Sequence, residues 1–306
     1  MLRTNAKHLV KMAVQGKVAP AMRFGAFELD AEGRGRSVPS VGGIVYNVKV
    51  GDPAFGWAGD HIEPAVSAIL NEEKRTNREN QAFNFLACVG NEAVVVSGDA
   101  KGARGIVTGH HGGVEHVLID FDDETLGKLA IEDKILVKAW GQGLALPDHP
   151  GVKVYNLDPG LLEKMGVRAV KDGLAVPVAA KIPAALMGSG IGHPDPGTGD
   201  YDITTQDPQM IKKHGLDRLR LGDFVAILDA DNTFGRHYYS GAVTIAIVAH
   251  SDSFVSGHGP GVCTLLSARR GLRPVLDAGA NLGRILKIGR FRAGARKAGV
   301  GFRPPA

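Results

Sequence analysis

The stretch AHSDSFVSGHGPGV, residues 249–262, combines side chains that can bind metals or move protons. His250 ends an apolar run, Asp252 lies two residues further on the same side of an extended chain, and His258 follows. We expect a site loop with His250 and Asp252 as metal ligands and His258 as a catalytic group, although a tight turn between buried strands would use the same residue types. Glycine lets the backbone approach a ligand, and the predicted substrate-binding glycines are Gly257, Gly259 and Gly261.

A pair of carboxylates stands out in MGSGIGHPDPGTGDYDITTQDP, residues 187–208. Asp200 and Asp202 share a face if the chain is extended there. Carboxylates paired in this way bind a divalent cation or divide acid and base roles. We therefore expect both to be metal ligands, with ordinary turn chemistry as the alternative.

A third candidate lies in GGIVYNVKVGDPAFGWAGDHIEP, residues 42–64, a long stretch without a regular strand pattern. His61 and Glu63 share a face of an extended chain, so the carboxylate can orient the imidazole. We predict both as catalytic residues. The structural alternative is that Pro64 begins a helix and that Asp60 or His61 caps it.

Two adjacent histidines, His110 and His111, precede a glycine pair in TGHHGGVEH. Neighbouring side chains of a strand point to opposite faces, so the pair does not converge on one ion. We expect both to contribute to substrate binding. A buried core position is expected for Cys263, with a thiolate at a helix start as the alternative, and no G-x-S-x-G elbow is present.

The elements that must position these residues are mostly strands. Apolar alternation and glycine turns predict strands over residues 92–96, 105–109, 114–121, 133–140, 224–230 and 241–250. Three short helices are predicted: one from Asn5 to Gly16, one opened by Asp158-Pro159 and one opened by Asp207-Pro208.

Regularly spaced short strands favour barrels or sandwiches over a parallel α/β sheet. The predicted fold is mainly β, a β-rich α+β protein with two barrel- or sandwich-like modules and a few short helices. The N-terminal domain spans residues 1–150 and includes an SH3-like module at about 86–145; the C-terminal β domain spans 151–270. A weak repeat, LAIEDKILVKA (129–139) and LRLGDFVAILD (219–229), places an aspartate in a turn before a strand in each module.

Composition separates the body of the chain from its end. The segment from Arg269 to residue 306 holds ten Lys or Arg residues and one acid, a net +9 within an overall +4, so the rest carries −5. Residues 271–306 are therefore predicted to be a basic tail, either solubilising or a binder of polyanions. Two cysteines and no apolar leader predict a soluble, cytoplasmic protein that binds no membrane, and we expect a homo-oligomer.

The letters VVVSGDAKGARGIVTG resemble the KOW motif of SH3-like barrels in ribosomal and transcription proteins. The turn is Gly98 to Gly102, and Lys101 and Arg104 are the groups that would meet phosphate. This local likeness implies an RNA-binding alternative that uses the turn and the basic tail. An exposed hairpin turn of an enzyme is the other interpretation.

Several longer motifs resemble an uncharacterised bacterial and archaeal family, a domain of unknown function: GGIVYN with GDHIEP, CVGNEAVVVSGDAKGARGIVTGHHGG, GSGIG with GDYDI, GRHYYSGAVTI and HSDSFVSGHGPGV. The likeness covers roughly residues 5 to 270 and implies a β-rich fold. Members carry HGPGVT at the last motif, so Cys263 departs from the pattern. A looser likeness to acetamidase/formamidase enzymes implies metal-dependent amide hydrolysis.

Together these observations predict a metal-dependent small-molecule hydrolase that acts on an amide or related C–N bond. Its cofactor would be a divalent metal, held where loops from both halves meet. An RNA-binding protein and a metal-free protein that binds a small anion are the alternatives, with nucleic acid the less favoured partner.

Overall fold

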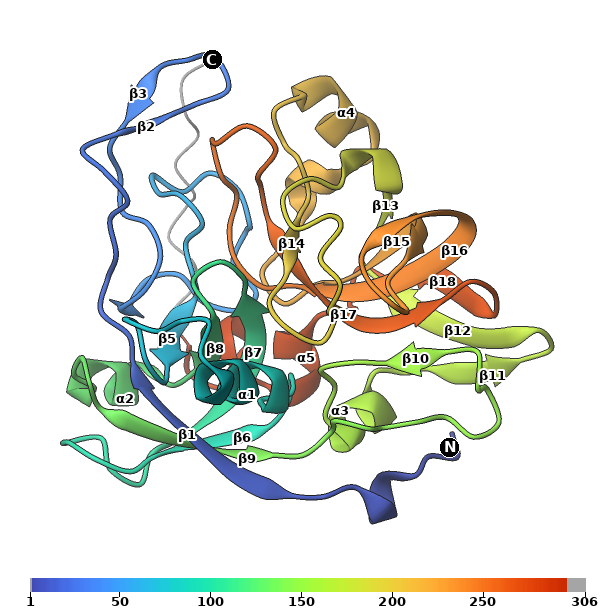
Figure 1. The fold of residues 1–306 in the computed structure, drawn as a ribbon, viewed down its shortest axis with the longest axis horizontal. Helices are drawn as coiled ribbons and strands as arrows, with labels where there is room; N and C mark the ends of the chain where they lie inside the picture. Colours follow the sequence, from blue (N-terminus) through green and yellow to red (C-terminus); the bar gives the residue numbers. More distant parts are fainter. Residues whose placement is uncertain (1, 296–306) are drawn as a thin grey trace.

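A closed six-stranded antiparallel barrel forms the first half of the protein in the computed structural model, which describes residues 2–295 (Figure 1). Around the barrel the strands are β1 (Met12–Val18), β9 (Lys134–Ala139), β6 (Glu92–Val95), β7 (Arg104–His111), β8 (His116–Asp120) and β5 (Ala65–Ile69). The barrel closes because β1 pairs with β5 as well as with β9. Strand β4 (Ile44–Val45) extends the sheet beyond β5.

Every second side chain of a barrel strand points into the interior and fills it. Along β9, Ile135, Val137 and Ala139 are buried while Lys134 and Lys138 are exposed. Helix α1 (Arg78–Leu86) adds Phe83 to the same core. Gly16 of β1 makes room for it, since a Cβ there would lie 2.6 Å from the phenyl ring of Phe83.

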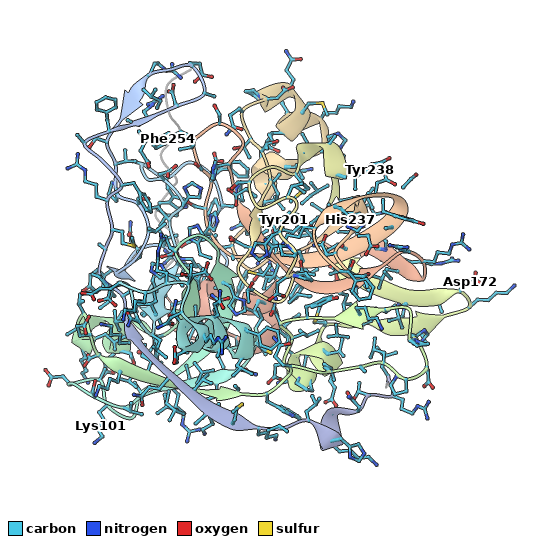
Figure 2. The ribbon with its side chains drawn as sticks, viewed as in Figure 1. Lys101, Asp172, Tyr201, His237, Tyr238 and Phe254 are labelled. Atoms are coloured by element: carbon cyan, nitrogen blue, oxygen red, sulfur yellow. The ribbon has the colours of Figure 1, made fainter. Side chains whose placement is uncertain are left out.

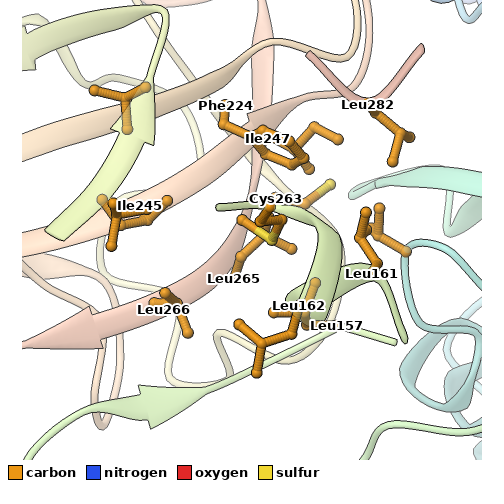
Figure 3. Close-up of a cluster of buried hydrophobic side chains, with 14 of the residues drawn as sticks. Leu157, Leu161, Leu162, Phe224, Ile245, Ile247, Cys263, Leu265, Leu266 and Leu282 are labelled. Atoms are coloured by element: carbon orange, nitrogen blue, oxygen red, sulfur yellow. The ribbon is translucent and has the colours of Figure 1, made fainter. Parts of the chain in front are cut away.

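The second half is built on a mixed sheet in the order β10 (Lys153–Val154), β17 (Gly261–Ala268), β16 (His237–Val248), β15 (Phe224–Asp231) and β13 (Ala180–Pro183). The two-residue strand β14 (Tyr201–Asp202) pairs with the start of β17. A three-stranded sheet packs beside it: β11 (Arg168–Val170), β12 (Gly173–Val178) and β18 (Leu272–Leu276). Figure 3 shows part of the core between these layers, with Leu161, Phe224 and Leu265 in it.

The remaining elements are short. The helices are α2 (Asp123–Lys128), α3 (Pro159–Lys164), α4 (Pro208–Lys213) and α5 (Leu282–Leu286). The 3₁₀ turns are η1 (Ala6–His8), η2 (Ala184–Leu186), η3 (Leu216–Arg218) and η4 (Gly289–Phe291), and a hairpin of β2 (Glu28–Leu29) and β3 (Gly35–Arg36) projects from the body. Among the described residues no helix is both long and apolar enough to cross a bilayer.

The prediction of a mainly β protein with few short helices is confirmed, as are the helices opened by Asp158 and Asp207. Each aspartate accepts two backbone N–H groups of its own first turn. The predicted turn role of the repeated aspartate is confirmed as well. Asp133 accepts the backbone N–H of Ala130 at 2.9 Å and Asp223 that of Arg220 at 2.8 Å, each just before a strand.

The prediction of a helix from Asn5 to Gly16 was wrong. Only Ala6–His8 form a helical turn, and Met12–Val18 form β1. Asn5 does not cap a helix; its side chain instead accepts the backbone N–H of Ala145 at 2.8 Å. Pairing with β9 and β5 closes the barrel, and that tertiary gain outweighs the local helical pattern.

Part of the predicted basic tail is folded into the body. Residues 272–291 form β18, α5 and η4, and β18 pairs in parallel with β12. Arg290 forms an ion pair with Asp52 at 2.7 Å, and Arg292 one with Asp120 at 2.5 Å. The rest of that prediction, including Lys297 and Arg303, lies outside the described residues.

Candidate functional site

The candidate site lies where one end of the barrel meets the second sheet. Gly109 of β7 packs against Ala249, the residue that follows β16, so closely that a Cβ at Gly109 would lie 2.8 Å from it. The backbone N–H of His110 approaches the sulfur of Cys263 in β17 at 3.1 Å. This contact brings histidines of the barrel beside Asp200 and Asp202, which flank Tyr201 near the middle of Figure 2.

The outer triad consists of His61, Asp202 and His258. Asp202 Oδ2 lies 2.8 Å from His258 Nδ1 and 3.6 Å from His61 Nε2, and the two imidazole nitrogens are 3.1 Å apart. The three side chains come from the loop before β5, from β14 and from the loop between β16 and β17. His258 is the most exposed of them, at 33%.

The inner triad consists of His111, Asp200 and His250, and all three are buried. Asp200 Oδ2 lies 2.9 Å from His250 Nε2, and the rings of His111 and His250 stack with centroids 4.1 Å apart. Within each triad, one ligand atom from each residue lies within 4.8 Å of the others. In a tetrahedral zinc site with bonds near 2.0–2.1 Å, ligand atoms are about 3.3 Å apart. The measured spacings of 2.8–3.6 Å in the outer triad and 2.9 Å in the inner one suit such coordination.

Three of the histidines are held by hydrogen bonds through Nδ1. The partner is Asp60 Oδ2 for His61 at 2.6 Å, Glu63 Oε1 for His111 at 2.6 Å, and the carbonyl of Ser251 for His250 at 2.8 Å. A proton on Nδ1 leaves the Nε2 lone pair free, which is how a carboxylate or carbonyl orients a metal-binding imidazole.

Two buried atoms of the inner triad lack a hydrogen-bond partner, namely His250 Nε2 and Asp200 Oδ2. They are only 2.9 Å apart, yet their directions are not those of a donor and an acceptor. Buried polar atoms in native proteins nearly always have a partner. A cation bound beside both atoms would supply the missing partner.

The electrostatics of the site favour positive charge. Four buried carboxylates, Asp60, Glu63, Asp200 and Asp202, cluster around the histidines, and the half-buried Asp252 lies nearby. Burial disfavours the imidazolium of His61, but the carboxylates of Asp202 and Asp60 outweigh it and raise its pKa to about 9. Burial also opposes the ionisation of Asp202, but His250, His258 and His61 hold its pKa well below the usual value. Without a metal, protons supply the charge that this pocket needs.

The two triads are joined through Asp202. Its Oδ2 faces the outer histidines, while its Oδ1 lies 3.7 Å from His250 Nε2 of the inner triad. The backbone of Asp202 is fixed at both ends, because its N–H donates to Ser189 and its carbonyl accepts from Gly188. One carboxylate therefore faces both groups of ligands.

A cavity of about 450 Å³ opens above the triads. Its floor includes His61, His111, Asp200, Asp202 and His258. Its wall adds Arg75, Glu115, Ser189, His193 and Arg236. This volume is in the range of small-molecule sites.

Family models match almost the whole described chain. The N-terminal "Domain of unknown function (DUF4438)" matches residues 27–163, and its C-terminal counterpart matches residues 164–286. The chain belongs to this family. It is also similar to one solved structure, the crystal structure of TM1086, with 49% identity and a TM-score of 0.86 over 92% of this chain and 97% of that one. No match was found among the curated proteins.

The loop that carries His61 in this DUF4438 protein is set by the second half of the chain. The backbone N–H of His61 donates to the carbonyl of Asp252 at 3.1 Å, and Ile62 and Ser251 exchange two hydrogen bonds. Asp60 Oδ1 accepts from the hydroxyl of Ser253 at 2.7 Å. These contacts hold His61 at a φ of 50°, a left-handed value rare outside glycine. Strained backbone of this kind is common at functional sites.

Of the predicted metal ligands, the structure brings His250, Asp200 and Asp202 into the triads and leaves Asp252 outside them. Asp252 accepts the hydroxyl of Thr205 at 2.5 Å and a backbone N–H, and burial raises its pKa to about 6. Of the predicted catalytic residues, His61 and His258 lie in the outer triad. The third, Glu63, is fully buried behind it and holds His111 and His116.

Of the predicted substrate-binding residues, only His111 lines the cavity. His110 points the other way and contacts the carbonyl of Ala87 through Nε2 at 2.6 Å. The three predicted glycines, Gly257, Gly259 and Gly261, are not among the described residues that line the cavity. Gly257 accepts from Ser189, Gly259 packs on the carbonyl of Ile203, and Gly261 lies beside the inner triad.

Some site residues were missed or misjudged from the sequence. From the sequence, Asp60 is predicted only as a possible helix cap, and no role is predicted for His116. The signal for Asp60 was its place directly before His61, which suits a carboxylate that orients an imidazole. Pro64 begins no helix, because Ala65–Ile69 form β5. Cys263 lies within β17, where burial raises the pKa of its thiol, so it is an inert core residue.

Proposed function

We propose that this protein is a metal-dependent hydrolase that cleaves an amide or related C–N bond in a small molecule. The observation that carries the proposal is the outer triad. Two histidines and one carboxylate present ligand atoms 2.8–3.6 Å apart on the floor of a cavity large enough for a small substrate. Three protein ligands with a fourth position open to substrate is the arrangement typical of catalytic zinc.

A divalent ion held by His61, Asp202 and His258 would lower the pKa of its bound water toward ~7 and polarise a carbonyl oxygen. The protein's own contribution is to hold those ligands in place. Asp60 keeps the proton of His61 on Nδ1 and the lone pair of Nε2 toward the cavity. Asp202 is fixed by its backbone pairing to Ser189 and Gly188.

A leaving amine requires a proton, and Glu115 is the residue that we propose to supply it. This residue lies on the cavity wall in the turn between β7 and β8, at a φ of 60°. Burial raises the pKa of its carboxyl group, which favours the protonated form that can donate. Its side chain is not engaged in an ion pair with any described residue.

The choice of a C–N bond is supported by the position of Glu115, a carboxyl group with a raised pKa, on the wall of the cavity that the outer triad also lines. It is also supported by the looser likeness to acetamidase/formamidase enzymes. No observation on the described residues favours the RNA-binding or the anion-binding alternative, and both stay predictions.

The test is elemental analysis of the untagged full chain, followed by a screen of small amides before and after removal of metal by a chelator. We expect bound divalent metal and an amidase activity that returns when Zn²⁺, Mn²⁺ or Co²⁺ is added back. Glu115→Gln should lower kcat about 100-fold or more while metal content is unchanged. Asp217→Asn, at an exposed position, is the matched control and should behave as wild type.

Protein that binds no divalent metal would contradict the proposal. So would metal-loaded protein that hydrolyses no amide in the screen. A Glu115→Gln variant with full kcat would remove the proton-donor role alone.

A further inference from the structure

The two triads differ in depth and in how many ligands reach them. His250 of the inner triad is 0% exposed and Asp200 is 6% exposed, whereas His258 of the outer triad is 33% exposed in its side chain. Asp202 Oδ1 also faces the inner histidine His250 at 3.7 Å. The inner group therefore has three residues whose ligand atoms lie within 4.8 Å of one another and a further carboxylate, Asp202, beside one of them, whereas the outer group has three residues in all.

Ligand number separates two kinds of zinc site. Structural sites have four protein ligands and are closed, whereas catalytic sites have three and keep one position for water or substrate. The inner group is closer to the first pattern, because its three residues are buried and Asp202 lies beside His250. The outer group fits the second, and its open side faces the cavity.

A glycine preserves space beside the inner ligands. A Cβ at Gly261 would lie 2.0 Å from Asp200 Oδ2 and 2.1 Å from His250 Nε2. These are the same two buried atoms that lack a hydrogen-bond partner. Any side chain at position 261 would occupy the space beside both of these atoms.

The inner carboxylate is also fixed in place. Asp200 Oδ1 accepts the backbone N–H of Gly112 at 2.7 Å, which leaves Oδ2 for another partner. The buried guanidinium of Arg236 donates to the carbonyls of Asp200 and Thr198 and so holds the loop before β14. Glu63 fixes His111 in the same way, so two of the three inner residues are held in place by hydrogen bonds.

We propose that the inner group binds a second divalent ion, which stays with the protein while the outer ion exchanges with solvent. Asp202 would be shared by the two sites, because its Oδ2 faces the outer histidines and its Oδ1 faces His250. An inner ion would help to orient this carboxylate and would neutralise part of the charge of the buried acids. The inference rests on the metal-binding part of the proposed function and is independent of which bond is cleaved.

The experiment measures zinc bound to the full chain by equilibrium dialysis against Zn²⁺ and elemental analysis. We expect two ions per wild-type chain, and one ion after dialysis against a weak chelator. His258→Ala should bind one ion that resists the weak chelator. Gly261→Ala should also bind one ion, but that ion should be lost to the chelator at least about tenfold faster than the ion in His258→Ala.

The matched control is Gly127→Ala. Gly127 lies on helix α2 with no atom within 4 Å of an added Cβ and no left-handed φ, so this variant should bind two ions like wild type. Far-UV circular dichroism checks that each variant folds. If Gly261→Ala does not fold, His111→Asn takes its place, with the same expected loss of the chelator-resistant ion.

One ion per wild-type chain that is lost in His258→Ala would overturn the inner site and leave the proposed hydrolase standing. Two ions retained by both Gly261→Ala and His111→Asn would also overturn it. Failure of wild-type protein to bind any zinc would reject the inner site and the proposed function together.

Discussion

Strand β7 has a glycine-rich turn at each end, and the two turns have different surroundings. The turn Gly98–Gly102 precedes the strand, and Lys101 within it is exposed to solvent. The turn after the strand begins at Gly112, whose N–H donates to Asp200 of the other half of the protein. In the sequence both turns have the same features, glycines with charged residues beside them. Among the described residues, only the second turn contacts the other half of the protein, and the candidate metal ligands from separate segments meet beside it.

The same contrast appears within two consecutive residues. His110 and His111 are both buried, but the pleat directs them to opposite sides of β7. His110 contacts a backbone carbonyl of α1's C-terminal end, whereas His111 stacks on His250 in the inner triad. Residue type alone therefore does not identify a site residue. What decides is which part of the protein packs against the side of the strand to which the residue points.

The sharpest way to break this contrast is to change each histidine separately. His111→Asn removes an inner ligand and should lower amidase activity by at least about 100-fold, with loss of one bound metal ion. His110→Asn should keep the wild-type metal content and lose about 1–3 kcal/mol of stability, because its buried partner at Ala87 is left poorly satisfied. Elemental analysis and thermal unfolding measure both. Equal metal loss in the two variants would show that the contrast is mistaken.

An intermediate effect on metal binding is expected from Glu63, which holds a candidate metal ligand in place without being one itself. Glu63→Gln keeps the shape of the side chain but replaces one acceptor oxygen that holds His111 or His116. Metal affinity should fall about 10–100-fold, the range for residues that orient metal ligands. Competition with a chelator of known affinity gives the number. Unchanged affinity would mean that Glu63 serves the fold alone.

The smallest effect is expected at the exposed turn. Lys101→Ala combined with Arg104→Ala should change stability by less than about 0.5 kcal/mol and leave metal content unchanged, because Arg104 makes only an exposed ion pair with Glu92. Thermal unfolding and elemental analysis measure these. If wild-type protein bound RNA at low salt and the double variant did not, the turn would have the role that its KOW-like letters imply.

Local sequence patterns predicted the individual strands and helices better than they predicted which strands pair with each other. Strands β6, β9 and β15 were expected from alternation, and the caps of α3 and α4 from Asp-Pro pairs. The helix predicted from Asn5 to Gly16 was wrong because β1 pairs with β9, whose residues are more than 100 positions away in the sequence. No local window contains that information.

The candidate site shows the same limit. The residue type and the two-residue spacing at the start of β14 were enough to select Asp200 and Asp202. The sequence did not separate His111 from His110, or place Asp252 and Glu63 behind the ligands. Those distinctions depend on which atoms are already hydrogen-bonded, for instance Asp252 by Thr205.

The segment that follows β18 has a consequence for how the protein is made. Arg290 is bound to Asp52, in the loop that leads toward His61, and Arg292 is bound to Asp120 at the end of β8. Contacts between such distant positions form slowly and late in folding. During synthesis, therefore, the loop that carries His61 is not fully anchored until residues near 290 have left the ribosome. The residues of the proposed metal sites would therefore come together only after the two halves have docked.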